Sequence, residues 1–343
     1  MSDLKVKKNI QSENFYFELE SSFRKQLFKD SLSIAKTVRN LSKEININYF
    51  NLWDAKTRTV ISLSMLRRLS KFLIKNGFKQ YAERSIEKHI IYIKNGFSQE
   101  KVFIKFPINL RTIEGMRFVS HLYHDGGIGK DNRQPNYTNQ QISEVKEFLS
   151  DAQRLFGKFH RKIVYYTNPH SKEAYYRVNL PTVIGDIMVS VGYKAGDKTK
   201  QNPNTFKFLE NIDNKELVSE FLSKAFNDDG SVGKRQINLG QASLINLKIK
   251  PSKVLLLDKL FLEKLNIKVN GPRLMGIYNN RHGKVSKFNI SISSKEQISK
   301  FYENIKLIEY KQRKIEAYLL NWGLRNHKRN KYILSQSFCS ARI

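Results

Sequence analysis

The feature that most constrains this chain is an internal repeat. The segment HDGGIGK at 124–130 recurs as DDGSVGK at 228–234. Each copy follows an apolar stretch of helical length, MRFVSHLY in the first and ELVSEFLSKAFN in the second. A polar strand candidate that ends in glutamine follows each, at 136–140 and 235–241. Two matched copies of about 100 residues each predict that one structural unit is present twice.

The segments after the repeated motif also match in their order. Apolar residues recur at helical spacing in ISEVKEFLSDAQRLFG of the first copy and in PSKVLLLDKLFLEKLN of the second. Two strand candidates come next, KIVYYT and AYYRVNL in one copy, RLMGIYN and KFNISIS in the other, and a helix closes each copy. We therefore predict an α+β fold of two pseudo-symmetric αββαββα repeats, one over 101–212 and one over 213–320.

The residues before the repeats have a different pattern. From about 16 to 96 we predict helices, because apolar residues recur at spacings of three, four and seven in Phe23, Leu27, Ile34, Val38, Leu41 and Ile45. A short polar break, ININ, precedes YFNLWDAK and the basic TRT, and a further apolar run ends at Gly77. This succession is typical of a helix-turn-helix module, whose second helix enters the major groove.

We accordingly predict a small all-helical, DNA-binding region over 1–100. The side chains that would read bases or backbone there are Asn48, Tyr49, Asn51, Lys56 and Arg58. The alternative is a helical cap whose charges merely face water.

The charge of the chain points to a polyanionic partner. Sixty-one Lys and Arg against 31 Asp and Glu give a net charge of +30. The excess cationic side chains repel one another in a compact chain unless a bound anion offsets their charge. Double-stranded DNA is the predicted partner. A membrane surface is the alternative, but no apolar run approaches the ~18–20 residues that span a bilayer. Cys339 is the single cysteine, so an internal disulfide is excluded and we expect an intracellular protein, in cytoplasm, nucleoid or organelle.

The acidic-Gly end of the first helix in each copy, the order of elements and the duplication resemble the LAGLIDADG family of homing endonucleases. The nine-residue motif would be FVSHLYHDG at 118–126 and LSKAFNDDG at 222–230. The segments IGDIMVSVGYKAGDKTK and NNRHGKVSKFNISIS are similar to the joint between copies and to a late hairpin in archaeal members. The resemblance covers about 105–320 and implies a DNA-binding saddle of two four-stranded antiparallel sheets.

The resemblance also implies a divalent-metal site, with Mg²⁺ or Mn²⁺ as cofactor. In the family the two motif helices pack side by side and deliver one acid each, and the matching acids are Asp125 and Asp229. Gly126 and Gly230 turn the chain after each acid and belong to the predicted metal site, while Asp228 leaves the register of the second acid open. We expect ionised carboxylates, because nearby cations lower their pKa. The alternative for each acid is an ordinary Asp-Gly turn.

Further catalytic candidates follow from the same resemblance. Gln140 and Gln241 end the first strand of each copy, where the family often orients a metal-bound water; the alternative is a solvent-facing strand residue. Lys130 and Lys234 match each other after the motif, and we favour phosphate contact over a catalytic role for both. Mid-helix positions that are small in the family hold His121 and Lys224 here.

The outer faces of the sheets should contact the bases. Arg and Asn or Gln can pair bidentately with guanine or adenine edges, and the candidates are Arg133, Gln134, Asn136, Thr138, Arg235, Gln236 and Asn238. Sheet packing, rather than base stacking, is predicted for Tyr165, Tyr166, Tyr175 and Tyr176.

The resulting functional prediction is a site-specific homing endonuclease, active in intron homing, that cuts both strands of a long asymmetric DNA target. We expect a monomer with internal pseudo-twofold symmetry and a basic C-terminal tail over 321–343. The alternatives are a transcriptional regulator that kept the fold and lost cleavage, and an RNA maturase that assists intron splicing.

Overall fold

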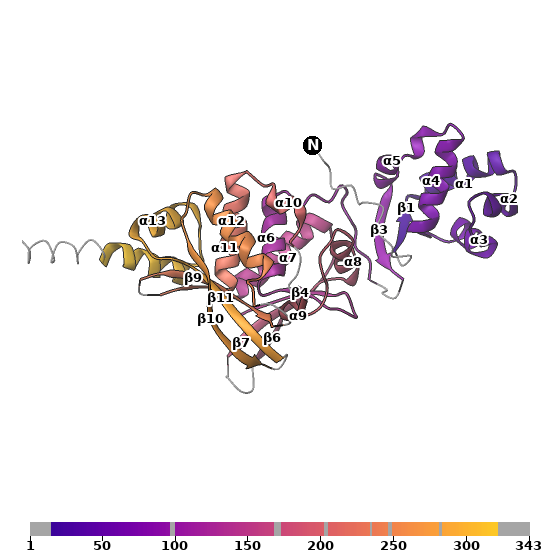
Figure 1. The fold of residues 1–343 in the computed structure, drawn as a ribbon. Helices are drawn as coiled ribbons and strands as arrows, with labels where there is room; N and C mark the ends of the chain where they lie inside the picture. The colour runs from indigo at the N-terminus through magenta and orange to yellow at the C-terminus, as the bar shows by residue number, and fades with distance from the viewer. Residues whose placement is uncertain are drawn as a thin grey trace, which may run out of the picture. The chain divides into compact units, whose positions relative to one another are not determined.

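The computed structural model describes residues 15–96, 100–167, 173–201, 205–233, 235–245, 249–280 and 283–321. This part of the chain combines helices with three antiparallel sheets (Figure 1). The chain divides into two compact units, one of Met1–Leu110 with Ile128–Gly192 and one of Arg111–Gly127 with Tyr193–Ile343. The second unit therefore contains the motif helix of both repeats.

The N-terminal part of the first unit contains a sheet as well as helices. Its elements are β1 (Phe15–Leu19), α1 (Ser21–Ala35), α2 (Val38–Glu44), α3 (Tyr49–Thr57), β2 (Val60–Ser62), α4 (Leu63–Lys75), the short 3-10 helix η1 (Lys79–Tyr81), α5 (Glu83–Glu87) and β3 (Ile90–Asn95). The strands form a sheet in the order β2-β1-β3. The prediction of an all-helical region is therefore wrong. In β1, buried Phe15, Phe17 and Leu19 alternate with more exposed residues, which is the period of two that a strand requires.

The helical spacing from Phe23 to Ile45 is divided between α1 and α2, and α3 follows after the polar break. The side chain of Thr37 accepts a hydrogen bond from the backbone N–H of Asn40 and caps α2, and that of Asn48 accepts one from Phe50 and caps α3. Both caps satisfy backbone donors that a first helical turn leaves unpaired. Gly77 follows α4 with a φ of +92°, which confirms the predicted helix stop.

The first repeat continues in this unit after its motif helix. Its elements are β4 (Gly127–Ile128), β5 (Pro135–Asn139), α7 (Ile142–Phe156), β6 (Val164–Thr167), β7 (Ala174–Asn179) and α8 (Thr182–Ser190), and the sheet order is β4-β5-β7-β6. Helix α7 covers one face of this sheet. There the rings of Tyr137 and Phe148, both fully buried, have centroids 5.0 Å apart.

The second unit holds α6 (Ile113–Tyr123), α9 (Lys198–Gln201), α10 (Lys207–Glu210), α11 (Lys215–Asp228), β8 (Gly230–Val232), β9 (Ile237–Leu244), α12 (Lys253–Lys264), β10 (Asn270–Asn280), β11 (Gly283–Ile292) and α13 (Lys295–Asn304). Its sheet order is β10-β11-β9-β8. Residues 309–321 are also helical, and the rest of the predicted basic tail lies outside the described residues. The predicted order αββαββα is confirmed in both repeats. Among the described residues no helix has the length and apolar character to cross a membrane.

Candidate functional site

The two motif helices, α6 and α11, pack directly against each other (Figure 1). The hydroxyl of Ser120 on α6 donates to the backbone carbonyl of Phe221 on α11 over 2.7 Å, and both residues are fully buried. At the edge of the contact, Arg117 Nε donates to Glu220 over 2.6 Å. A serine hydroxyl that reaches the main chain of a neighbouring helix requires a close approach of the two backbones.

Two buried histidine–aspartate contacts lie in and beside this helix interface. His121 Nδ1 is 2.9 Å from a carboxylate oxygen of Asp228, and neither side chain is exposed. The large residue in the first motif helix is thus accommodated by a partner on the second. His124 Nε2 is 3.4 Å from Asp258, also with both side chains fully buried. Burial alone would lower the pKa of His124, but the charge of Asp258 and its hydrogen bond raise it to about 9, so this pair holds a proton at neutral pH.

The two motif acids lie at the C-terminal ends of the paired helices. Asp125 follows the last turn of α6, and Asp229 is the C-cap residue of α11. Burial and then the charges of Asp228 and Asp229 raise the pKa of Asp125 to about 7, although the residue as a whole is exposed by more than a third of its surface. Burial also raises the pKa of Asp229. The expectation of lowered pKa values is therefore wrong for both acids, because burial disfavours their charged forms more than the nearby cations favour them.

A lysine from a later segment caps each of these helix ends. Lys198 Nζ donates to the backbone carbonyl of Tyr123 over 3.2 Å and to that of His124. The final carbonyls of a helix have no partner within it and carry the negative end of the helix dipole, so an ammonium group stabilises them. Burial lowers the pKa of Lys198, and the charges of Asp229 and Asp125 oppose that shift.

The end of α11 is held in the same way by Lys311. Its ammonium donates to the carbonyls of Phe226, Asn227 and Gly230 at 2.7, 2.8 and 2.7 Å. A Cβ at Gly230 would lie 2.5 Å from the carbonyl oxygen of Phe226, so only glycine fits this turn. Sequence reasoning missed both capping lysines. Lys198 lies in the KAGDKTK segment, but neither lysine is near its helix in the sequence.

The other predicted catalytic residues lie in varied positions. Gln241 accepts a hydrogen bond from Ser252, the N-cap residue of α12, over 2.5 Å, and strand β9 continues past it to Leu244. The prediction that Gln241 ends its strand is therefore wrong. Gln140 follows β5 and is exposed, as is Lys130, while Lys234 lies outside the described residues.

The predicted base-contacting residues of the first repeat lie on or beside β5. Asn136 and Thr138 flank buried Tyr137 and so point away from α7. On β7 they pair in register with Asn179 and Arg177, two polar residues that sequence reasoning missed. Arg133 and Gln134 precede the strand and are partly exposed. Four polar residues of β5 and β7 therefore lie together on the sheet face that points away from α7.

The four tyrosines of β6 and β7 form two cross-strand pairs. Tyr165 and Tyr176 face each other across the strands with ring centroids 5.4 Å apart, and Tyr166 and Tyr175 do so at 5.9 Å. They pack on each other as expected, yet Tyr165 is 58% exposed and Tyr166 is 40% exposed.

The corresponding residues of the second repeat lie at the start of β9. Arg235 and Gln236 are exposed just before the strand. Asn238 lies between buried Ile237 and Leu239, so it faces away from α12, and its side chain accepts from Asn289 over 3.2 Å.

In the N-terminal region the predicted contact residues belong to α3 and its ends. Asn48 is the N-cap residue, Arg58 is the C-cap residue, and Tyr49, Asn51 and Lys56 are exposed on the helix. Two further aromatic side chains of α3 reach solvent, Phe50 at 75% and Trp53 at 46% exposure.

Comparisons with known proteins give distant similarities. No protein-family model matches the chain, and no curated protein is significantly similar in sequence. The crystal structure of full-length DUF199/WhiA from Thermatoga maritima is 14% identical, and the match covers 68% of this chain and 71% of that one, with a TM-score of 0.38. The homing endonuclease I-DmoI in complex with DNA and Mn is 15% identical over 57% of this chain and 97% of its own, with a TM-score of 0.35. The homing endonuclease I-WcaI bound to its DNA recognition sequence is 14% identical over 61% and 87%, with a TM-score of 0.36. These similarities are too distant to assign a function.

Proposed function

We propose that this chain is a divalent-metal-dependent endonuclease of the LAGLIDADG type that cuts double-stranded DNA as a monomer. The observation that carries the proposal is the placement of Asp125 and Asp229. They are equivalent residues of two repeats, and they lie at the ends of two helices that pack directly together within one unit. The charges of Asp228 and Asp229 at the end of one helix both raise the pKa of Asp125 at the end of the other, so the acids of the two repeats influence one another.

The residues at this place fit a hard divalent cation. Magnesium and manganese prefer carboxylate, carbonyl and water oxygens, and the acids at the helix ends supply carboxylates. Burial and then the charges of Asp228 and Asp229 raise the pKa of Asp125 to about 7, and a bound cation would offset the negative charge of these acids. Asp125 and Asp229 would hold the ion, beside Gly126 and Gly230. When bound, such an ion stabilises charge on a phosphate and makes water a better nucleophile.

The remaining parts of the site position these acids and the DNA. Lys198 and Lys311 fix the two helix ends through their carbonyls and so hold the acid-bearing turns in place. The polar sheet face around Asn136 and Arg177 supplies donors and acceptors suited to base edges. We retain Lys130 and Lys234 as proposed phosphate contacts, and the net charge of +30 supports a polyanionic partner.

One observation favours a second candidate, a DNA-binding protein of the same fold that does not cut. The protonated His124 and the ammonium of Lys198 both oppose the charge of the motif acids, so the chain supplies positive charge of its own at this place. A protein that uses the two helices only as a scaffold for DNA binding would be stable with these acids, because His124 and Lys198 oppose their charge.

Cleavage with matched variants tests the proposal. A plasmid library of genomic inserts is incubated with the protein or with one of three variants, in Mg²⁺ or in EDTA. The variants are Asp125→Asn, Asp229→Asn and the exposed-acid control Asp131→Asn. We expect metal-dependent double-strand cuts at one long site by the protein and the control, and loss of cutting with retained binding in the other two. Tight binding without cuts in any divalent metal overturns the proposal and leaves the non-cleaving reading.

A further inference from the structure

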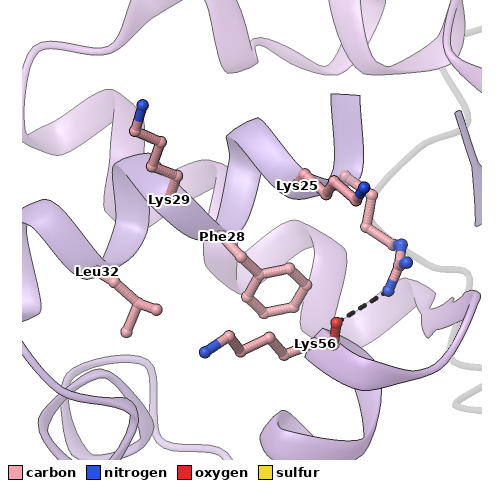
Figure 2. Close-up of a pocket in the computed structure, with 6 residues that line it drawn as sticks. Lys25, Phe28, Lys29, Leu32 and Lys56 are labelled. Atoms are coloured by element: carbon pink, nitrogen blue, oxygen red, sulfur yellow. Dashed lines mark hydrogen bonds between the residues drawn. The ribbon is translucent and has the colours of Figure 1, made fainter. Parts of the chain in front are cut away.

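A basic pocket lies in the N-terminal region, between α1 and the C-terminal end of α3, and Lys56 is the one lining residue for which the sequence predicts a DNA contact. It has a volume of about 200 Å³ and is lined by Arg24, Lys25, Phe28, Lys29, Leu32 and Lys56. Figure 2 shows the ring of Phe28 in the middle of this pocket, with the side chain of Lys56 extended beside it. Four of the six lining residues carry a positive charge and none is acidic.

The tertiary structure places these charged residues around one pocket. Lys25 and Lys29 are four residues apart on α1, which places them on the same face of the helix. The guanidinium of Arg24 donates to the carbonyls of Lys56, over 3.0 Å, and of Arg58, and so holds the end of α3 against α1. Lys56 thereby enters the pocket from the second helix (Figure 2).

This arrangement has an electrostatic cost that an anion removes. Like charges four residues apart on a helix repel each other and destabilise it, and here a third lysine and an arginine are added. The buried ring of Phe28 and the side chain of Leu32 form an apolar floor. An ion bound above such a floor is less screened than one in bulk water, so its attraction to the lysines is stronger.

We propose that this pocket binds a phosphate group of the DNA backbone and thereby docks α3 against the duplex. The exposed surface of α3 adjoins the pocket, because Lys56 Nζ lies 5.5 Å from the ring centroid of Trp53, which is 46% exposed. In helix-turn-helix proteins, phosphate contacts fix the position of the helix that reads the groove. The inference rests on DNA as the proposed partner and is independent of cleavage.

The salt dependence of binding by the full-length chain tests this assignment. Binding is measured by the anisotropy of a labelled duplex at a series of NaCl concentrations. The protein is compared with the double variant Lys25→Gln/Lys29→Gln, the single variant Lys56→Gln and the control double variant Lys71→Gln/Lys75→Gln. The control pair is also exposed and four residues apart, but on α4 and outside the pocket. Glutamine keeps helix propensity close to that of lysine, so all variants fold.

Each lost phosphate contact lowers the slope of log K against log salt by about 0.9 and weakens binding roughly threefold to tenfold at low salt. We expect this change in both pocket variants and no change in the control pair. Equal weakening by the control pair overturns the proposal, because it indicates diffuse attraction only. Unchanged DNA binding in the pocket variants also overturns it. If inorganic phosphate then raises the melting temperature of the protein but not of the variants, the pocket takes free phosphate instead.

Discussion

Replacing Asp125 by asparagine should stabilise the protein at alkaline pH while it abolishes cleavage. The pKa of this carboxyl is raised from 3.8 to about 7, by burial first and then by Asp228 and Asp229. An acid with a raised folded-state pKa binds its proton more tightly in the folded chain than in the unfolded one. The free energy of unfolding therefore falls as the pH rises from about 4 to about 7, and stays low above that.

The magnitude follows from the shift and from the exposure of the side chain. Each pKa unit corresponds to 1.36 kcal/mol, so a shift of about three units sets an upper bound of about 4 kcal/mol. Solvent screens an exposed carboxylate, and Asp125 keeps an exposed edge, so we expect about 1 kcal/mol. For a unit of this size that raises the melting temperature by about 2–4 °C.

Thermal unfolding in EDTA, followed by circular dichroism at pH 8 and at pH 5, measures the effect. The variant should melt higher than the protein at pH 8 and at nearly the same temperature at pH 5, where the carboxyl is already protonated. Asp131→Asn, at an exposed site, serves as the control and should show no such pH-dependent gain. A loss of stability in Asp125→Asn at pH 8, or an equal gain at both pH values, would refute the electrostatic reasoning.

Two substitutions at the end of α11 test how its turn is held. Gly230→Ala should lower the free energy of unfolding by about 1–3 kcal/mol, because the new methyl group meets the backbone of Phe226. The control Gly127→Ala has open space around it and should cost little. The midpoint of urea unfolding compares the two variants. Lys311→Met should cost about 2–3 kcal/mol, since three carbonyls lose a charged donor, and the exposed control Lys314→Met should leave the melting temperature nearly unchanged. Equal effects of test and control variants would contradict either prediction.

The sequence predicts the order of elements well because the repeat reports it twice. The helical spacing before each Asp-Gly pair and the strands after it recur in both copies, so one copy corroborates the other. The N-terminal region occurs once and offers no such check. Its strands are short, and the alternation of Phe15, Phe17 and Leu19 is readable only when a period of two is considered beside the helical period.

The parts of the site that sequence reasoning missed depend on contacts between distant segments. Lys198 and Lys311 reach helix ends more than seventy residues away in the chain, and no local pattern predicts where an ammonium group will lie. The same holds for Asp258, whose contact with His124 joins α12 to the end of α6. The sign of the pKa shift at Asp125 also depended on burial and on neighbouring acids, which composition could not supply.

Binding of Mn²⁺ tests most directly whether the two repeat acids form one cation site. Free Mn²⁺ is measured by electron paramagnetic resonance as it is titrated into the protein, Asp125→Asn, Asp229→Asn and the control Asp213→Asn, whose side chain is 90% exposed. The account predicts that each motif variant weakens the same site by at least about tenfold, or 1.4 kcal/mol, while the control matches the protein. Unchanged Mn²⁺ affinity in both motif variants would contradict it.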